Sequence, residues 1–433
     1  MRTNPQVPLH RLVLSLADAM DCVHKEISNH QIRVAYGSTH IARSMGIEGQ
    51  ALLDVFLAAA FHDIGLVRAD NRLLALHLGR LEELRWHGEC GYQLLRDQPL
   101  LAAAALSVRY HHLPWAHGRG GQHDGQEVPL ASHIIQLADE VDRLIDRDAP
   151  ILRQQPSIRD RLVSLRGSRL HPRCVEAFEA LADSEAFWLD WVSDRIYGVL
   201  LNQVDWPTPT LDESIIKPIA EVFALIVDAG SRWTATHSAG VTAVAVALSE
   251  RLGFSAHEQA LMRAAGYLHD LGKLTIPSAI LDKPQRLTAD ESLCMKQHVY
   301  HTFRILDTIG GLPQIAQWAA FHHERLDGRG YPFRHGGGDL TLGSRIMAVA
   351  DVFTAVTEDR PYRRGMPKPE SLAVLDKLVA NGGIDGDVVG VLRAGFDDID
   401  AICRQEQAQY IQRQERLARH FAGTPMLGKQ RGR

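Results

Sequence analysis

Histidines and aspartates form the pattern in this sequence with the clearest chemical meaning. The chain has 22 histidines among 433 residues, and two series of them, each ending at an aspartate, follow nearly the same spacing in its two halves. Imidazole and carboxylate groups together suit Fe, Mn, Zn or Ni, and two such ions can clamp a phosphodiester for in-line attack. The first series is His30, His62, Asp63, His87, His111, His112 and Asp139, and the second is His237, His269, Asp270, His298, His322, His323 and Asp351.

The spacing of the two series predicts two copies of one fold. The step from the first histidine to the His-Asp pair is equal in both, as is the step from the lone histidine to the His-His pair. The sequences that flank these residues are also similar in the two halves. FHDIG at 61–65 matches LHDLG at 268–272, and IIQLADEV at 134–141 matches IMAVADVF at 346–353.

The elements that carry these residues are predicted to be helices. Apolar residues recur at three- and four-residue steps in Ala35–Gly46 and Val241–Gly253, whereas strand-like alternation is scarce. Ala58–Ile64 and Ala264–Leu271 are almost wholly apolar up to the His-Asp pair, as in a buried helix. We therefore expect an all-α protein with two tandem helical domains, at residues 1–201 and 212–422, joined by a proline-containing linker at 202–211 and followed by a disordered tail at 423–433.

Composition narrows the class of protein. A net charge of −5 argues against a DNA-binding or membrane-surface protein, which needs a basic excess. The five cysteines form no CxxC pair, so we expect neither a disulfide framework nor a thiolate zinc site. No apolar run reaches the length of a membrane span, and the N-terminal stretch has no signal-peptide pattern. These features predict a protein of the cytoplasm that binds neither DNA nor membrane.

Two motifs of the second half resemble the HD-GYP family. They are HDLGK at 269–273 and HHERLDGRGYP at 322–332, and the likeness extends over roughly 211–404, with a weaker HD-only copy over roughly 9–198. The resemblance implies an all-helical HD fold, a centre of two or three divalent metal ions, and hydrolysis of cyclic di-GMP to the linear dinucleotide or the mononucleotide. Fe or Mn is the first choice of metal, and Ni or Zn is an alternative. The implied metal ligands are the seven residues of the second series, with Asp270 bridging the ions.

The resemblance also implies which residues meet the substrate. Lys273 would reach a non-bridging phosphate oxygen and, with Asp270, would be catalytic. Arg360 and Arg363 match positions expected to hold the phosphate and guanine, and Tyr331 would line either the base pocket or a partner surface.

Two departures from the family pattern change the expected metal count. Members with three metals carry a glutamate four residues before the first histidine, where this chain has Trp233, so we predict a binuclear site in the second copy. In the first copy the corresponding residue is Glu26, which extends its possible metal set beyond the seven residues of the first series.

The first copy lacks the residues expected to meet a substrate. Leu66 replaces the lysine, Asp148 and Ile151 stand in place of the two arginines, and no GYP motif follows His112. Two hypotheses stay open: a regulatory pseudo-domain, or a metal-bound 5′-nucleotidase acting on the linear product.

Several functions stay open for the whole chain. A phosphodiesterase specific for 3′,3′-cyclic GMP-AMP is the runner-up to cyclic di-GMP hydrolysis, because the metal motifs do not separate the two substrates. A non-enzymatic cyclic-dinucleotide receptor is a third reading, although receptors usually lose metal ligands. A homodimer and a diguanylate cyclase (GGDEF) partner are further expectations.

Overall fold

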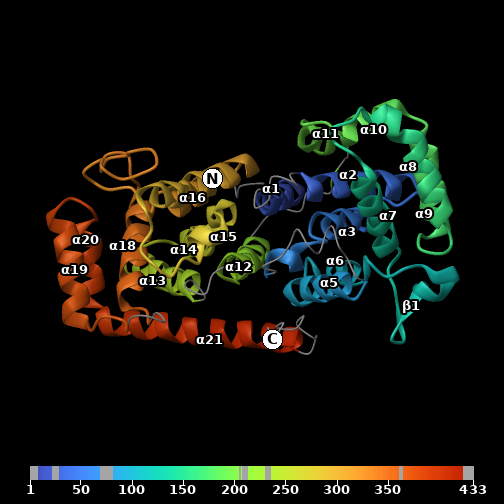
Figure 1. Cartoon of the computed structure of the whole chain (residues 1–433). Coiled ribbons are helices and arrows are strands. Elements are labelled where there is room, and N and C mark those ends of the chain that lie inside the picture. The colour runs from blue at the N-terminus through green and yellow to red at the C-terminus, as the bar shows by residue number, and fades with distance from the viewer. Residues whose placement is uncertain are drawn as a thin grey trace, which may run out of the picture. The chain divides into compact units, whose positions relative to one another are not determined.

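The computed structural model describes residues 8–21, 29–68, 81–203, 206, 213–229, 236–359 and 364–422. Several predicted positions lie outside the described residues: Glu26, Trp233, Arg360, Arg363, most of the predicted linker and the tail at 423–433. Helices dominate what is described, in agreement with the all-α prediction (Figure 1). The chain divides into two compact units whose main parts are residues 8–209 and 210–418.

The first unit is a helical domain with one short hairpin. Its helices α2, α3, α6 and α7 pack on one another. His30 and Asp139 lie in α2 and α7, and the His-Asp and His-His pairs follow α3 and α6. Strands β1 (Gln122–His123) and β2 (Gln126–Glu127) pair antiparallel beyond α6. The helices are α1 (Leu9–Asp21), α2 (His30–Ser44), α3 (Gly49–Ala60), η2 (Ile64–Arg68), α5 (Leu81–Leu95), α6 (Ala102–Tyr110), η3 (Ala116–Gly121), α7 (Leu130–Leu144), α8 (Ile151–Leu165), α9 (Pro172–Ala182), α10 (Glu185–Trp191) and α11 (Ile196–Gln203).

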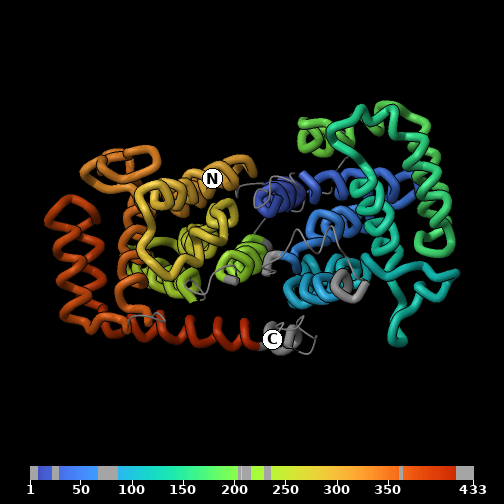
Figure 2. Tube along the Cα trace, viewed as in Figure 1, coloured from blue at the N-terminus to red at the C-terminus, as the bar shows by residue number. Residues whose placement is uncertain are grey.

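The second unit repeats this arrangement. Helix α13 packs between α14 and α18, as α2 packs against α3 and α7, and α19 and α20 pack on each other beside α18 (Figure 2). The helices are α12 (Glu213–Ala229), α13 (His237–Arg251), α14 (Ala256–Leu268), η4 (Leu271–Thr275), α15 (Ser278–Leu281), α16 (Ala289–Ile309), α17 (Pro313–Ala320), α18 (Leu342–Thr357), α19 (Lys368–Ala380), α20 (Gly386–Ala394) and α21 (Phe396–Ala422).

Local sequence signals account for where these helices start and stop. Ser255 and Thr288 each begin a helix with a capping box, because Glu258 and Glu291 return the hydrogen bond to the backbone. The apolar segments before the two His-Asp pairs are shorter helices than the pattern predicts. Helix α3 ends at Ala60 and α14 at Leu268, and each His-Asp pair lies in the turn that follows.

One segment, Gly49–Leu66, is apolar and long enough by composition to be tested as a membrane span. Its mean hydropathy is 1.2, and 78% of it is buried inside the domain. Its apolar character is therefore accounted for by the helical core, where Phe56 and Leu57 are fully buried.

Candidate metal centres

The second His/Asp series comes together from five parts of its domain. His237 is the first residue of α13, His269 directly follows α14, and Asp270 lies in the turn before η4. His298 stands in the middle of α16, and Asp351 in α18. His322 and His323 follow α17, so the fold gathers residues that are far apart in sequence.

Asp270 lies at the centre of this group. Its Oδ2 is 3.3 Å from His269 Nε2, and its Oδ1 is 3.4 Å from His298 Nε2. The two carboxylate oxygens thus face different histidines, as a carboxylate shared by two metal ions requires. The potential ligand atoms fall into three overlapping groups, each within 4.8 Å: His298, His322 and His323; His237, His269 and Asp351; and His269, Asp270 and His322.

Backbone carbonyl groups orient three of these histidines. The Nδ1 atoms of His269, His298 and His322 donate to the carbonyl oxygens of residues 266, 295 and 319, at 2.8, 2.7 and 2.7 Å. Each bond leaves the Nε2 lone pair free to bind a cation. The Nε2 atoms of His269 and His298 are buried, and no hydrogen bond from the described part of the chain satisfies them. The residues present therefore fit a metal centre.

The electrostatics of the site favour the neutral form of three of its imidazoles and the anionic form of Asp270. Burial lowers the pKa of His298, His322 and His323 to about 3. Burial opposes ionisation of Asp270, but the neighbouring His269 and the Lys273 ammonium hold the pKa of this carboxyl well below its usual range. Neutral imidazole and ionised carboxylate are the forms that bind a divalent cation.

His237 is held by two carboxylates. Its Nε2 lies 3.0 Å from Asp351 Oδ1, and its Nδ1 lies 3.5 Å from Glu358 Oε2. Burial disfavours its charged form, but the hydrogen bonds to Asp351 and Glu358 outweigh burial and raise the pKa of His237 to about 10. A divalent cation at Nε2 would replace that proton.

The residues predicted to contact the substrate are only partly among the described residues, and those that are described lie at the edge of the metal centre. The Lys273 ammonium lies 2.5 Å from Asp270 Oδ2 with its side chain 15% exposed, so it borders the centre and is paired with the central carboxylate. The Tyr331 ring lies 5.0 Å from the His323 ring, at the edge of the site. Arg360 and Arg363 lie outside the described residues.

Glu324 shapes the loop that carries Tyr331. Its buried carboxylate accepts hydrogen bonds from the backbone N–H groups of Phe333, Arg334 and His335 at 2.7, 3.1 and 3.1 Å. A Cβ atom on Gly330 would lie 2.5 Å from the Glu324 Cα, so only glycine permits this close approach. The glutamate of the HHE motif therefore folds the loop.

Three supporting residues were not identified from the sequence. Glu358 faces His237, Asp228 accepts from Ser238 at 2.9 Å, and the Thr302 hydroxyl donates to the His269 carbonyl oxygen at 3.1 Å. Asp228 could have been found from the repeat in the sequence, because it precedes His237 by the same number of residues as Asp21 precedes His30. Asp21 accepts a hydrogen bond from the backbone N–H of Gln31, in the first turn of α2, at 3.0 Å.

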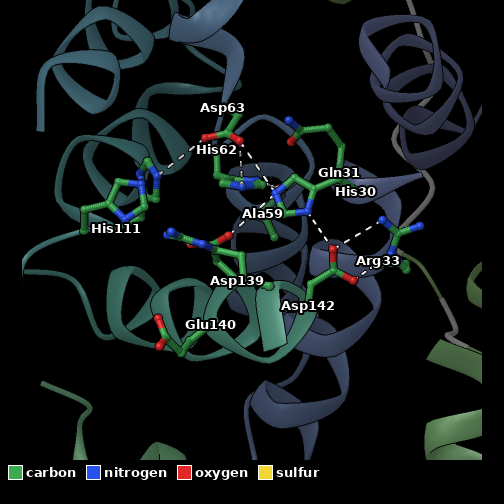
Figure 3. Close-up of polar contacts among 12 residues, drawn as sticks. His30, Gln31, Arg33, Ala59, His62, Asp63, His111, Asp139, Glu140 and Asp142 are labelled. Carbon is green, nitrogen blue, oxygen red and sulfur yellow. Dashed lines mark hydrogen bonds and ion pairs between the residues drawn. The ribbon is translucent and has the colours of Figure 1, made fainter. Parts of the chain in front are cut away.

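The first series also converges, around Asp63 (Figure 3). Asp63 Oδ2 lies 3.4 Å from His62 Nε2 and 3.6 Å from His30 Nε2. Asp63 Oδ1 lies 3.0 Å from His87 Nε2 and 3.9 Å from His111 Nε2. The other two members of the series adjoin these, since His112 Nε2 is 3.1 Å from His87 Nε2 and Asp139 Oδ1 is 3.6 Å from His30 Nε2.

Comparison with known proteins agrees with this duplicated architecture. Residues 27–144 and 221–388 each match a family model described as an HD domain. The chain is 31% identical to the 3′3′-cGAMP-specific phosphodiesterase 1 of Vibrio cholerae, over 89% of this chain and 91% of that protein. It is 38% identical to the cyclic di-GMP phosphodiesterase response regulator RpfG of Xanthomonas campestris, over 37% of this chain and 43% of that protein.

A solved structure shares the fold. The crystal structure of a cyclic GMP-AMP-specific phosphodiesterase of Vibrio cholerae, V-cGAP3, superposes with a TM-score of 0.61 at 24% identity, covering 90% of this chain and 98% of that chain. Two HD domains in tandem, each with a converged His/Asp centre, define a metal-dependent phosphohydrolase. Within that class, the chain belongs to the HD-GYP family of cyclic dinucleotide phosphodiesterases.

Proposed function

We propose that the second domain hydrolyses 3′,3′-cyclic GMP-AMP at a two-metal site. The observation that carries the chemistry is the placement of Asp270, whose two oxygens face different groups of histidines. The substrate preference is supported by relatives that match both domains: cGAMP-specific phosphodiesterases 1 and 3 of Vibrio cholerae align with 89% and 90% of the chain.

The metal ligands would be the seven residues of the second series, with Asp270 as the bridge. The set contains no thiolate, which favours iron or manganese, with nickel or zinc as alternatives. Two divalent ions bound there would supply positive charge against the phosphate and lower the pKa of a water molecule. The site is accessible at His323 and Asp351, whose side chains are 30% and 13% exposed, so a phosphodiester could enter on that side.

Lys273 would stabilise the phosphate as negative charge develops. Its ammonium is already held at the rim of the centre by Asp270. Catalysis gains most from a charge that is fixed before the reaction begins, because no reorganisation is then required. Tyr331 would border the base-binding region, and Arg360 and Arg363 would bind phosphate and base.

Cyclic di-GMP, which the sequence favours as substrate, is the second candidate. Its support is a partial likeness to RpfG, at 38% identity over 37% of the chain. A similar partial likeness, at 39% identity over 43% of the chain, links it to the 3′3′-cGAMP-specific phosphodiesterase 2 of Vibrio cholerae, so these partial matches do not favour cyclic di-GMP. The likeness to RpfG covers only 37% of the chain, whereas that to the cGAMP-specific phosphodiesterase 1 covers 89%. We further infer that the enzyme acts in the cytoplasm.

The test is a paired assay of the two cyclic dinucleotides with Fe²⁺ or Mn²⁺ added, the products being separated by chromatography. We expect faster hydrolysis of 3′,3′-cyclic GMP-AMP and loss of all hydrolysis in Asp270→Ala and His269→Ala. A chain that binds either dinucleotide without cleaving it would instead be a receptor. Equal or faster cleavage of cyclic di-GMP would overturn the substrate assignment while leaving the phosphodiesterase intact.

A further inference from the structure

The first domain contains a second converged set of histidines and aspartates that the proposed hydrolysis does not use. We infer that this set is a closed metal centre, bridged by Asp63, which stabilises the domain and does not turn over substrate. The inference goes beyond the proposed function, because it concerns only the first domain.

The first argument is the direction of the ligand atoms. His62 Nδ1 donates to the Ala59 carbonyl oxygen at 2.8 Å, and His111 Nδ1 donates to that of Val108 at 2.6 Å. His30 Nδ1 lies 2.7 Å from the Asp142 carboxylate. In all three residues the Nε2 atom therefore points inward, towards Asp63.

The second argument is that two of the inward atoms make no hydrogen bond to the described part of the chain. The Nε2 atoms of His30 and His62 are buried without a hydrogen bond from the described residues. An unsatisfied polar atom inside a protein is costly, and two on facing side chains require an explanation. A cation between Asp63 Oδ2 and these two nitrogens would satisfy both at once.

The third argument is the spacing on the other side of Asp63. His87 Nε2 lies 3.1 Å from both His111 Nε2 and His112 Nε2. Adjacent nitrogens around one ion, at a metal–nitrogen distance of about 2.1 Å, lie about 3.0 Å apart at a right angle and about 3.4 Å at the tetrahedral angle. These three nitrogens and an Asp63 oxygen thus have the spacing of ligands around a single ion.

The two oxygens of Asp63 divide these groups as those of Asp270 do. Oδ1 faces the lone histidine and the His-His pair, whereas Oδ2 faces the histidine of the His-Asp pair. In the second domain Oδ1 faces His298 and Oδ2 faces His269, which are the corresponding residues. The bridging arrangement is therefore the same in both domains.

What differs is access. The difference does not lie at His62, His87 and His111, which are fully buried, because their counterparts His269, His298 and His322 are at most 3% exposed. It lies at the last histidine, since His112 is only 7% exposed. Its counterpart His323 has a side chain that is 30% exposed. Metal sites that are closed by protein ligands are structural, whereas catalytic sites keep an open position. Leu66 in place of a lysine removes, in addition, the cation that would face a phosphate.

The experiment measures metal bound to the full chain after loading with Fe²⁺ under anaerobic conditions and desalting. The variants are Asp63→Asn, which keeps the shape of the bridge without its charge, and His62→Gln in case the first does not fold. The matched control is His133→Ala, because His133 is equally buried in the same domain but lies outside the cluster. Hydrolysis by the second domain reports that each chain is folded.

We expect Asp63→Asn and His62→Gln to lose about half of the bound iron and to unfold at a lower temperature, while His133→Ala retains the iron. Wild-type iron content in both variants would overturn the inference. So would release of phosphate from a 5′-phosphorylated linear dinucleotide by the wild type but not by Asp63→Asn, since the centre would then be open and hydrolytic. If no cyclic dinucleotide is cleaved but Asp63→Asn still loses iron, the proposed function fails and this inference stands.

Discussion

Replacing Lys273 with methionine tests whether a fixed cation is needed beside the metal centre. The substitution keeps an unbranched side chain that is one atom shorter and removes its charge. Two unit charges about 4 Å apart interact by about 4 kcal/mol at an effective dielectric constant of about 20. Because Asp270 already neutralises part of the ammonium charge, we expect a loss of about 3 kcal/mol of transition-state stabilisation, or about 10²-fold in kcat.

The assay compares kcat and KM of the wild type and Lys273→Met on the preferred cyclic dinucleotide, with iron content measured on the same samples. Metal should be retained, because removing Lys273 frees an oxygen of Asp270. The matched control is Lys283→Met, which breaks a similar pair with Glu291 at 2.6 Å and should leave hydrolysis unchanged. An unchanged kcat in Lys273→Met would refute the electrostatic role, and a parallel loss of metal would assign Lys273 to holding Asp270 instead.

Three further substitutions examine the surroundings of the site. Gly330→Ala should destabilise the loop by about 2 kcal/mol or more in denaturant unfolding, whereas Gly338→Ala, where a Cβ meets no atom within 4 Å, should not. Burial raises the pKa of Asp228 to about 7, so the folded chain holds a proton that the unfolded chain has released. As the pH rises from about 4 to about 7, the free energy of unfolding of the wild type should therefore fall relative to that of Asp228→Asn, by at most about 1.4 kcal/mol per pH unit. A difference in unfolding free energy that does not change with pH would contradict this. Arg360→Ala should raise KM more than it lowers kcat in steady-state kinetics.

The repeat in the sequence was sufficient to predict two copies of one fold and both groups of converging residues, and helical periodicity predicted the all-α class. Equal intervals between histidines indicate a repeated fold, because such intervals are retained only if both copies keep the same helices in the same order. Local periodicity was less accurate at the His-Asp pairs. There, burial extends beyond the end of the helix, so an apolar run continues through Phe61 although α3 ends at Ala60.

The carboxylates that orient the first histidine of each copy could not be found from spacing. Asp142 faces His30 in the first domain and Glu358 faces His237 in the second, but they do not occupy equivalent positions. Aligned on the last aspartate of each series, Asp142 corresponds to Thr354, which lies one helical turn before Glu358. The two copies thus reach a similar contact from different turns, and only the three-dimensional packing reveals it.

The comparison of the two domains distinguishes the residues that would bind metal from the residues that catalysis would need in addition. Asp63 and Asp270 hold their histidines in the same order around two carboxylate oxygens, so the geometry of the ligands would not account for the difference in activity that we infer. What the second domain adds is a lysine at the central carboxylate, a loop folded by Glu324, and exposure at His323. A duplicated domain that lost these features would retain its ligands, because each buried imidazole that binds a cation also contributes to stability.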